Sequence, residues 1–327
     1  MILIFTEKKD THVNKVGEYF NKANISWFRI NTEDFCDNIS LTIEPTKNKS
    51  LLKIKDSNLV FPLESIKAVW YRKPAPVDVS HFNLDQANLD YIQGEFNQVI
   101  DGIYALLHER LWINNPLTSR LAHRKPLQLK IANELGFITP KTLITNEPEK
   151  ALEFAESINW DLAIKSLGAI CVNSSSDEEN AELNYGLFTR RVNKEELLTL
   201  QNNIAYMPTV FQEYIEKDYE LRITVVGEQI FACRIESQKE SLSSEDMRFN
   251  ISNLSHKICD LPSEINEKLL AYLKTYNLNF GCFDLAVNKN GEYIFFECNP
   301  NGQWLWIEKL TDAPISKAVA NLLINNI

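Results

Sequence analysis

The sequence predicts an α/β (α+β) protein with more than one subdomain, and three observations support this fold class. The chain has 327 residues, which is more than one hydrophobic core usually serves. Residues 1–115 alternate apolar runs typical of buried strands with helical patterns. Residues 206–299 are instead mainly strand-like, so we expect a separate sheet there.

The first 115 residues predict an α/β unit. Ile2–Thr6 is an apolar run typical of a buried strand, and a helical pattern follows it. Residues 26–30 and 67–72 are predicted strands, and short alternating strands are predicted within 41–61. A long amphipathic helix comes next. Its predicted apolar face consists of Leu89, Ile92, Phe96, Val99, Ile103 and Leu106.

Asn114-Asn115-Pro116 interrupts this pattern, so we place the first boundary there. A helix is predicted around residues 127–135, and Gly136 suits the position just after its end, where a positive φ is common. The elements predicted next are a strand at 142–145, a helix at 151–157 and a strand at 162–166.

The last third predicts two hairpins, each followed by a helix. One hairpin surrounds the turn Gly227-Glu228, and the other lies within residues 283–299. The helices are predicted at 265–276 and 313–327. We therefore expect three parts, with the boundaries 1–115, 116–205 and 206–327.

Composition excludes several classes of protein. The net charge is −10 and no run is rich in Lys or Arg, which argues against nucleic acid and suits a basic peptide. None of the six cysteines lies in a C-x-x-C pair and no histidines pair at metal-ligand spacing, so we expect reduced thiols in a cytoplasmic protein. No signal peptide, membrane span, Walker lysine loop or nucleophile elbow is visible.

The strongest functional signal is the second hairpin. Asn290-Gly291 is a favoured two-residue turn, since both of its central positions need a positive φ. With this turn, Val287 faces Ile294, and Asp284 falls opposite Glu297. Opposed residues of an antiparallel pair share a face, so the two carboxylates are expected side by side.

The same alternation places Asn299 beside Glu297, with Phe296 and Cys298 on the other side of the strand. Two neighbouring carboxylates repel, so a cation must offset their charge. Mg²⁺ takes oxygen ligands of this kind and usually brings nucleotide phosphates. The alternative is a solvated face of an edge strand, which the apolar run around Glu297 disfavours.

Two lysines are candidates for phosphate binding. Lys165 closes an apolar strand before a turn of small residues and can place a point charge on phosphate oxygens. Lys125 stands beside Arg124 just before a predicted helix. Taken alone, a lysine at the end of an element is more commonly a surface residue.

The segment from residue 210 to 222 can bind a nucleoside. Its extended part, Gln212, Glu213, Tyr214 and Ile215, offers backbone donors and acceptors to a base. Glu220 can bind ribose hydroxyls, and Arg222 on the same face can hold an acyl phosphate bidentately. The alternative is a surface Glu–Arg pair, which contributes little.

Two further arginines stay open at this point. A two-residue turn at Gly227-Glu228 sets Arg222 opposite Cys233 and directs Arg234 to the other face. A three-residue turn with a bulge would bring Arg222 and Arg234 together. Arg248 is either a loop residue or a second anion ligand.

In this order, these pieces resemble the ATP-grasp superfamily. The sequences E-L-R-I-T-V-V-G at 220–227 and F-E-C-N-P-N-G-Q-W at 296–304 are similar to the microviridin-type peptide ligases. Those enzymes mature graspetides, which are ribosomal peptides closed by side-chain esters or amides. The resemblance covers most of the chain and is most specific in the C-terminal third.

The resemblance implies an ATP-grasp fold: a pre-ATP-grasp α/β domain at 1–115, a central subdomain at 116–205 and a C-terminal subdomain at 206–327 that carries the metal site. It also implies ATP and Mg²⁺ as cofactors. The nucleotide ligands would be Lys125, Lys165, Gln212, Glu213, Tyr214, Ile215 and Glu220. The Mg²⁺ ligands would be Asp284, Glu297 and Asn299, and the catalytic arginines Arg222, Arg248 and Arg234.

The implied activity is an ATP-dependent ligase. It would activate Asp or Glu side chains of a precursor peptide as acyl phosphates and close rings with Ser/Thr hydroxyls or Lys amines. The family also implies a homodimer. A glutamate ligase that extends a protein C-terminus, or an inactive ATP-grasp protein that only binds peptide, are the alternatives.

One departure from the family lies after Lys165, where a glycine-rich flap is usual and serines precede an acidic run. In related ligases, a hairpin of this domain recognises the leader peptide. Asp177, Glu178 and Glu179 are therefore candidates to bind a basic leader residue, with a solvated loop as the alternative.

Overall fold

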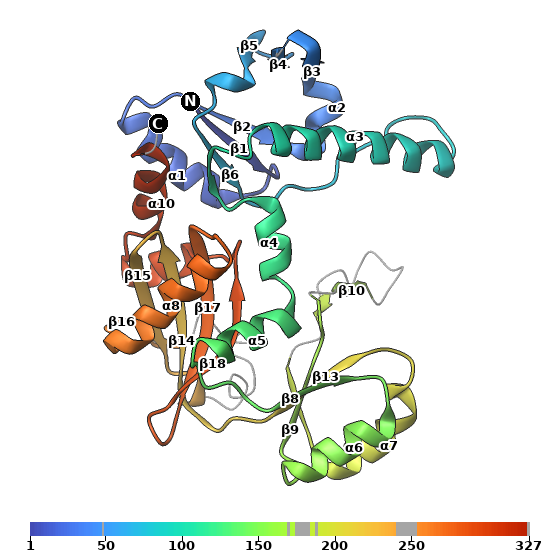
Figure 1. The fold of residues 1–327 in the computed structure, drawn as a ribbon, viewed down its shortest axis with the longest axis vertical. Helices are drawn as coiled ribbons and strands as arrows, with labels where there is room; N and C mark the ends of the chain where they lie inside the picture. The colour runs from blue at the N-terminus through green and yellow to red at the C-terminus, as the bar shows by residue number, and fades with distance from the viewer. Residues whose placement is uncertain (48, 169–170, 174–183, 187–188, 240–253, 326–327) are drawn as a thin grey trace.

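The computed structural model describes the whole chain except residues 48, 169–170, 174–183, 187–188, 240–253 and 326–327 (Figure 1). Helices and strands are mixed throughout, as the sequence predicts. No helix within the described parts of the chain combines the length and the apolar character that crossing a bilayer requires.

A parallel sheet with the strand order β2-β1-β6-β7 begins the chain. Its strands are β1 (Ile2–Thr6), β2 (Trp27–Asn31), β6 (Ala68–Tyr71) and β7 (Leu111–Ile113). Alternate residues of β1 enter different cores: Ile2 and Ile4 pack with α1 (Thr11–Lys22), and Leu3 and Phe5 pack with α3 (Gln86–Leu106). Helices thus cover both faces of the sheet, which explains why β1 is apolar without interruption.

A smaller antiparallel sheet follows α2 (Phe35–Asn38). It consists of β3 (Ile39–Glu44), β4 (Lys49–Ile54) and β5 (Leu59–Pro62). The apolar face predicted for α3 is only partly right. Ile100, Ile103 and Tyr104 are buried, but Val99 and Leu106 are 37% and 52% exposed.

The middle of the chain forms an antiparallel sheet with the order β12-β9-β13-β8. Its strands are β8 (Thr142–Thr145), β9 (Leu162–Lys165), β12 (Arg190–Val192) and β13 (Thr209–Glu213). The helices α6 (Pro148–Ser157) and α7 (Lys194–Ile204) cover it, and β10 (Cys171–Asn173) pairs with β11 (Asn184–Gly186) as a separate hairpin (Figure 1).

Two helices, α4 (Pro116–Ala122) and α5 (Lys125–Glu134), lead into this middle part. Gly136 follows α5 with a φ of +77°, as predicted. Its N–H donates to the Asn133 carbonyl (3.0 Å), and that of Phe137 donates to the Ala132 carbonyl (2.9 Å). These two bonds form a Schellman motif, which ends the helix and turns the chain toward β8.

The last part is a five-stranded antiparallel sheet with the order β16-β15-β14-β17-β18. Its strands are β14 (Lys217–Val226), β15 (Gln229–Ile235), β16 (His256–Cys259), β17 (Phe280–Asn288) and β18 (Tyr293–Asn299). One face packs on α8 (Ser263–Thr275) through Tyr272, Phe283 and Phe295. The other face packs near α9 (Leu305–Thr311) and α10 (Ile315–Ile324).

A shared core joins the two ends of the chain. Val13 and Val16 of α1 pack in one cluster with Ile315 and Val319 of α10, and the two helices lie side by side (Figure 1). The buried Asn114 adds polar bonds: its Oδ1 accepts from the N–H groups of Asn279 and Phe280 at 2.8 and 3.0 Å. The N-terminal unit therefore rests directly on the C-terminal sheet.

Candidate functional site

The carboxylate hairpin keeps its predicted pairing but not its predicted turn. Asp284 lies opposite Glu297, whereas Val287 pairs with Tyr293 rather than with Ile294. The turn is longer than predicted because Asn288 closes it with an N–H bond to the Glu292 carbonyl (3.1 Å). A bulge next to Asp284 then takes up the extra residue and restores the pairing.

The bulge also changes which side chains enter the site. Phe295 and Cys298 are fully buried in the core, while Phe296 is half-buried and lies under the Lys165 ammonium, 4.6 Å from its ring centre. The prediction that Phe296 shares the side of Cys298 is therefore wrong. An aromatic ring beside a candidate phosphate ligand joins the site instead.

Three oxygen-bearing side chains meet where β17 and β18 pair. Arg222 Nη1 donates to both carboxylate oxygens of Asp284 at 2.8 Å. The Asn299 amide donates to Asp284 Oδ2 (3.4 Å) and to Glu297 Oε1 (3.2 Å), and so bridges the two carboxylates. Lys125 lies on the other side, with its Nζ 3.7 Å from Glu297 Oε2.

The pKa values of the two carboxyl groups shift in opposite directions. Burial raises the pKa of Asp284 to about 6, with the repulsion of Glu297 adding to burial and Arg222 opposing it. Burial also acts on Glu297, but Lys125 and Asn299 outweigh it and lower the pKa of that carboxyl. The Asn299 amide already bridges the two carboxylates. The oxygens of these three side chains fit Mg²⁺, since this ion prefers such oxygen ligands.

Both candidate phosphate ligands lie near this junction. Lys125, at the start of α5, donates to the Ser166 carbonyl (2.8 Å) besides approaching Glu297. Lys165, at the end of β9, donates to Gln212 Oε1 (2.7 Å). Gln212 Nε2 in turn donates to Thr142 Oγ1 (2.9 Å), which fixes the amide between two strands of the middle sheet. The structure thus brings lysines from two elements toward one pair of carboxylates.

The segment from Gln212 to Ile215 leaves the middle sheet at the end of β13. The N–H groups of Glu213 and Tyr214 donate to the carbonyls of Lys141 and Asp161, both at 2.9 Å, and this fixes the backbone as it crosses to β14. On β14, the buried Glu220 accepts from Lys217 Nζ (2.6 Å) and Ser237 Oγ (3.0 Å) at one oxygen, Oε1.

The turn between β14 and β15 has two residues, since Val226 pairs with Gln229. Arg222 therefore faces Cys233, and Arg234 faces Leu221 on the opposite side of the sheet. Arg234 donates to Glu236 Oε1 (2.6 Å) and stacks on the Tyr219 ring. The structure does not bring Arg234 to Asp284, so our choice of it as a catalytic residue finds no geometric support. Arg248 and the leader candidates Asp177, Glu178 and Glu179 lie outside the described residues.

Two side chains that sequence reasoning missed, Asn114 and Arg72, hold the loop that follows Asn299 together with Arg222. Asn114 Nδ2 donates to the Pro300 carbonyl (2.7 Å), and Arg222 Nη2 donates to the Gln303 carbonyl (3.2 Å). Arg72, only 1% exposed at the end of β6, donates to the Asn301 carbonyl. Three side chains from distant parts of the chain thus fix three carbonyls of one short loop.

Asp10 contacts Arg72, and His12 contacts Asp10 in turn. Asp10 Oδ2 lies 3.4 Å from Arg72 Nε, and its Oδ1 lies 3.2 Å from His12 Nδ1. His12 Nε2 accepts from the Trp304 N–H (3.2 Å), which requires the proton of a neutral ring to sit on Nδ1. Burial lowers the pKa of His12, consistent with this neutral form.

Residues 1–120 match the family model of the MvdD pre-ATP-grasp domain. No curated protein matches the chain. Among solved structures, a ribosomal-peptide-associated ATP-grasp ligase of Chryseobacterium gregarium, in complex with ADP and a leader and core peptide, is similar. It is 29% identical, with a TM-score of 0.89, and the match covers 100% of this chain and 97% of that one.

Two macrocyclases of Microcystis aeruginosa MRC are also similar. MdnC, bound with the precursor peptide MdnA, is 29% identical with a TM-score of 0.86, and 99% of each chain is covered. MdnB is 30% identical with a TM-score of 0.78, and the match covers 99% of this chain and 98% of that one. Together with the convergence of Lys125 and Lys165 on Asp284 and Glu297, these matches show that the chain belongs to the ATP-grasp ligases that mature ribosomal peptides of the graspetide type.

Proposed function

We propose that this ligase activates Asp or Glu side chains of a ribosomal precursor peptide as acyl phosphates and closes macrocyclic esters with Ser/Thr or amides with Lys. The observation that carries the proposal is the junction of β17 and β18. There Asp284 and Glu297 lie between Arg222 on one side and Lys125 on the other. Similarity to ligases whose structures contain ADP or precursor peptides supports it.

ATP and Mg²⁺ are the cofactors in this proposal. Asp284, Glu297 and Asn299 would hold the ion, which when bound neutralises charge on the phosphates. Lys125 and Lys165 would hold phosphate oxygens. The backbone of Glu213 and Ile215 would bind adenine, with Gln212 and Tyr214 shaping the segment between the sheets, and Glu220 would bind the ribose.

The chemistry needs no nucleophile from the protein. A carboxylate oxygen of the peptide attacks the γ-phosphorus, and ADP leaves. The hydroxyl or amine then attacks the carbonyl carbon, inorganic phosphate leaves, and a proton passes to solvent. Arg222 would hold the acyl phosphate, because its guanidinium is already oriented by Asp284 and the Gln303 carbonyl. Arg248 would be a second anion ligand.

The remaining assignments are proposals of the same kind. We divide the chain into a pre-ATP-grasp domain (1–115), a central subdomain (116–205) and a C-terminal subdomain (206–327). Asp177, Glu178 and Glu179 would bind a basic residue of the leader, and the enzyme would work in the cytoplasm. Exposed Leu117 and Leu121 on α4, 67% and 57% exposed, support a homodimer that would cover them.

Mass spectrometry tests the proposed reaction. A precursor peptide rich in Thr, Lys, Asp and Glu at its C-terminal end is incubated with the full chain, ATP, Mg²⁺ and free glutamate. We expect the peptide to lose one water for each ring and to release one ADP for each water. A gain of residue mass would instead show a glutamate ligase. ATP and peptide binding without ADP release would show an inactive peptide-binding protein.

A further inference from the structure

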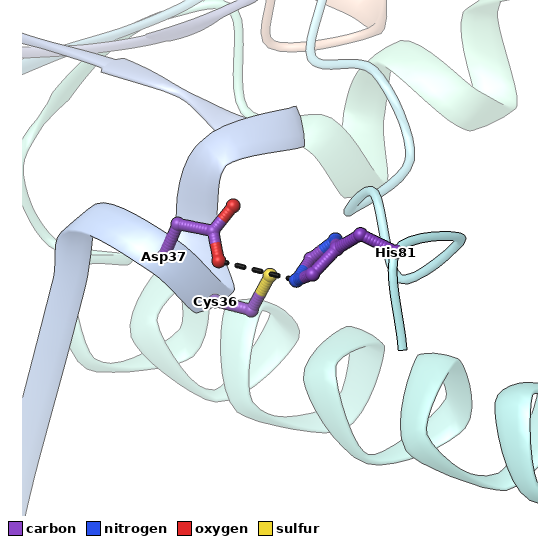
Figure 2. Close-up of side chains that lie close together, drawn as sticks. All are labelled: Cys36, Asp37 and His81. Carbon is purple, nitrogen blue, oxygen red and sulfur yellow. Dashed lines mark ion pairs between the residues drawn. The ribbon is translucent and has the colours of Figure 1, made fainter. Parts of the chain in front are cut away.

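Three potential metal ligands meet far from the nucleotide site, on the N-terminal unit. Cys36 and Asp37 belong to the one-turn helix α2, and His81 belongs to the irregular segment between β6 and α3. Their ligand atoms all lie within 4.8 Å of one another. Figure 2 shows the thiol, the carboxylate and the imidazole pointing toward one another. Residues 44 positions apart in sequence thus present three donors to one point at the surface.

The contacts of the three side chains are compatible with a shared ligand. His81 Nε2 lies 3.2 Å from Asp37 Oδ1, and the two side chains are 43% and 64% exposed. The protonated Cys36 thiol lies 3.2 Å from the carbonyl oxygen of Asp78, to which it donates. Because the His81 and Asp37 side chains are exposed, water can reach the cluster and serve as a further ligand.

The spacing is close to that of the ligands around a tetrahedral ion. Zn²⁺ binds nitrogen and oxygen at about 2.0–2.2 Å and sulfur at about 2.3 Å, which separates neighbouring ligand atoms by about 3.3–3.7 Å. The distance between His81 and Asp37 is already near the short end of that range. A thiolate and an imidazole with one carboxylate are donors that zinc prefers, and they are unlike the all-oxygen set of Asp284, Glu297 and Asn299.

We propose that Cys36, Asp37 and His81 bind Zn²⁺, with water as the fourth ligand. On binding, a sulfur–zinc bond forms and the thiol proton passes to solvent, so the bond to the Asp78 carbonyl is lost. The ion would tie α2 to residues 73–85, a segment without helix or strand. This site is independent of the proposed ligase reaction, and its failure would leave that reaction untouched.

Binding is measured on the full-length, untagged, metal-free chain. Zn²⁺ is titrated against a chromophoric chelator with Mg²⁺ in excess, so that the carboxylates of β17 and β18 are occupied. We expect one Zn²⁺ per chain. Cys36→Ser, Asp37→Asn and His81→Gln should each weaken binding by more than about tenfold, since loss of even an outer-shell partner costs about 10–100-fold.

Matched controls replace residues of the same kinds elsewhere. Cys259→Ser on β16 and His108→Gln, which is 69% exposed, should leave the affinity unchanged. Co²⁺ supplies a second readout, because a cobalt–thiolate bond gives a charge-transfer band that should be present in the wild type and absent in Cys36→Ser. Equal Zn²⁺ affinity in the wild type and Cys36→Ser, or a Co²⁺ spectrum without that band, would overturn the proposal and leave a simple surface ion pair.

Discussion

Gln128 on α5 hydrogen-bonds both backbone groups of Cys298 on β18. Its Nε2 donates to the Cys298 carbonyl (2.8 Å), and its Oε1 accepts from the Cys298 N–H (2.9 Å). A side-chain amide thus serves the edge of β18 as a neighbouring strand would. Because Cys298 stands between Glu297 and Asn299, this one buried side chain sets the position of two proposed metal ligands.

Gln128→Ala should therefore weaken both the fold and the metal site. It leaves two buried backbone groups without partners, and each costs about 1–3 kcal/mol of the free energy of unfolding. We also expect a higher Mg²⁺ concentration for half-maximal ADP release. Urea unfolding and a Mg²⁺ titration measure the two effects. Gln86→Ala, at an exposed position of α3, is the control, and an equal effect of both changes would contradict the role of Gln128.

Glu297→Gln keeps the shape of the side chain and removes its charge. Several kcal/mol of stabilisation of the phosphoryl group depend on the metal, so ADP release should fall by more than about a hundredfold while the fold persists. Circular dichroism and coupled ADP assays test this. Glu292→Gln, in the exposed turn of the same hairpin, should retain full activity. Near-normal turnover of Glu297→Gln would reject the metal assignment.

Asp10 should make the fold sensitive to acid. Burial alone would raise its pKa, but His12 and Arg72 outweigh burial and hold the pKa well below the usual range. A carboxyl with a lowered pKa stabilises the fold above its unfolded pKa of about 4, and this contribution is lost as the pH falls further.

Asp10→Asn should therefore be less stable than the wild type at pH 7, by about 3 kcal/mol because a buried ion pair is broken. The difference should shrink as the pH falls below about 4. Urea unfolding at several pH values follows it. Asp10 is the N-cap residue of α1, and Asp85→Asn at the exposed N-cap of α3 should have a much smaller effect at pH 7. A difference that stays constant with pH would count against the ion pair.

Gly302→Ala should disturb the loop after Asn299. An added Cβ would lie 2.4 Å from the Cys282 Cβ and 2.9 Å from Arg222 Nη2, so either the loop or the arginine must move. We expect a loss of about 1–3 kcal/mol in stability and a larger loss of activity. Gly94→Ala on α3, where the added Cβ meets nothing within 4 Å, should be neutral or stabilising. Equal activity of the two variants would contradict the crowding at Gly302.

The predicted pairing of Asp284 with Glu297 is correct although the hairpin differs from the predicted one in two ways. The longer turn shifts the register by one residue, and the bulge shifts it back. Asn288 accepts from the N–H groups of Asn290 and Glu292 through its Oδ1, which stabilises a longer turn than Asn290-Gly291 alone would form. The bulge at Phe296 then restores the register. Nothing in two adjacent phenylalanines shows which one leaves the core, so the orientation of Phe296 could not be predicted.

Other parts of the site depend on contacts between distant elements. Gln128, Arg72 and Lys217 carry no local pattern that distinguishes them from surface residues, yet each is buried. The orientation of Arg234 depends on whether the turn has two or three residues, and Gly227-Glu228 is compatible with both lengths. The exposed Val99 and Leu106 of α3 show the same limit. Periodicity indicates which residues share a face of a helix, but not which element covers that face.

The hydrogen bonds to the loop after Asn299 limit how the enzyme can move. Asn114 and Arg72, from the first part of the chain, bind the carbonyls of Pro300 and Asn301 in the last part. Together with the bond from Arg222 to the Gln303 carbonyl, they join the first and last parts into one rigid base. If the enzyme must open to admit ATP and close to keep water out, the base cannot supply the motion. The middle sheet is then the part that moves. It joins the base through the stretches at 135–141 and 214–216, and we expect any hinge to lie there.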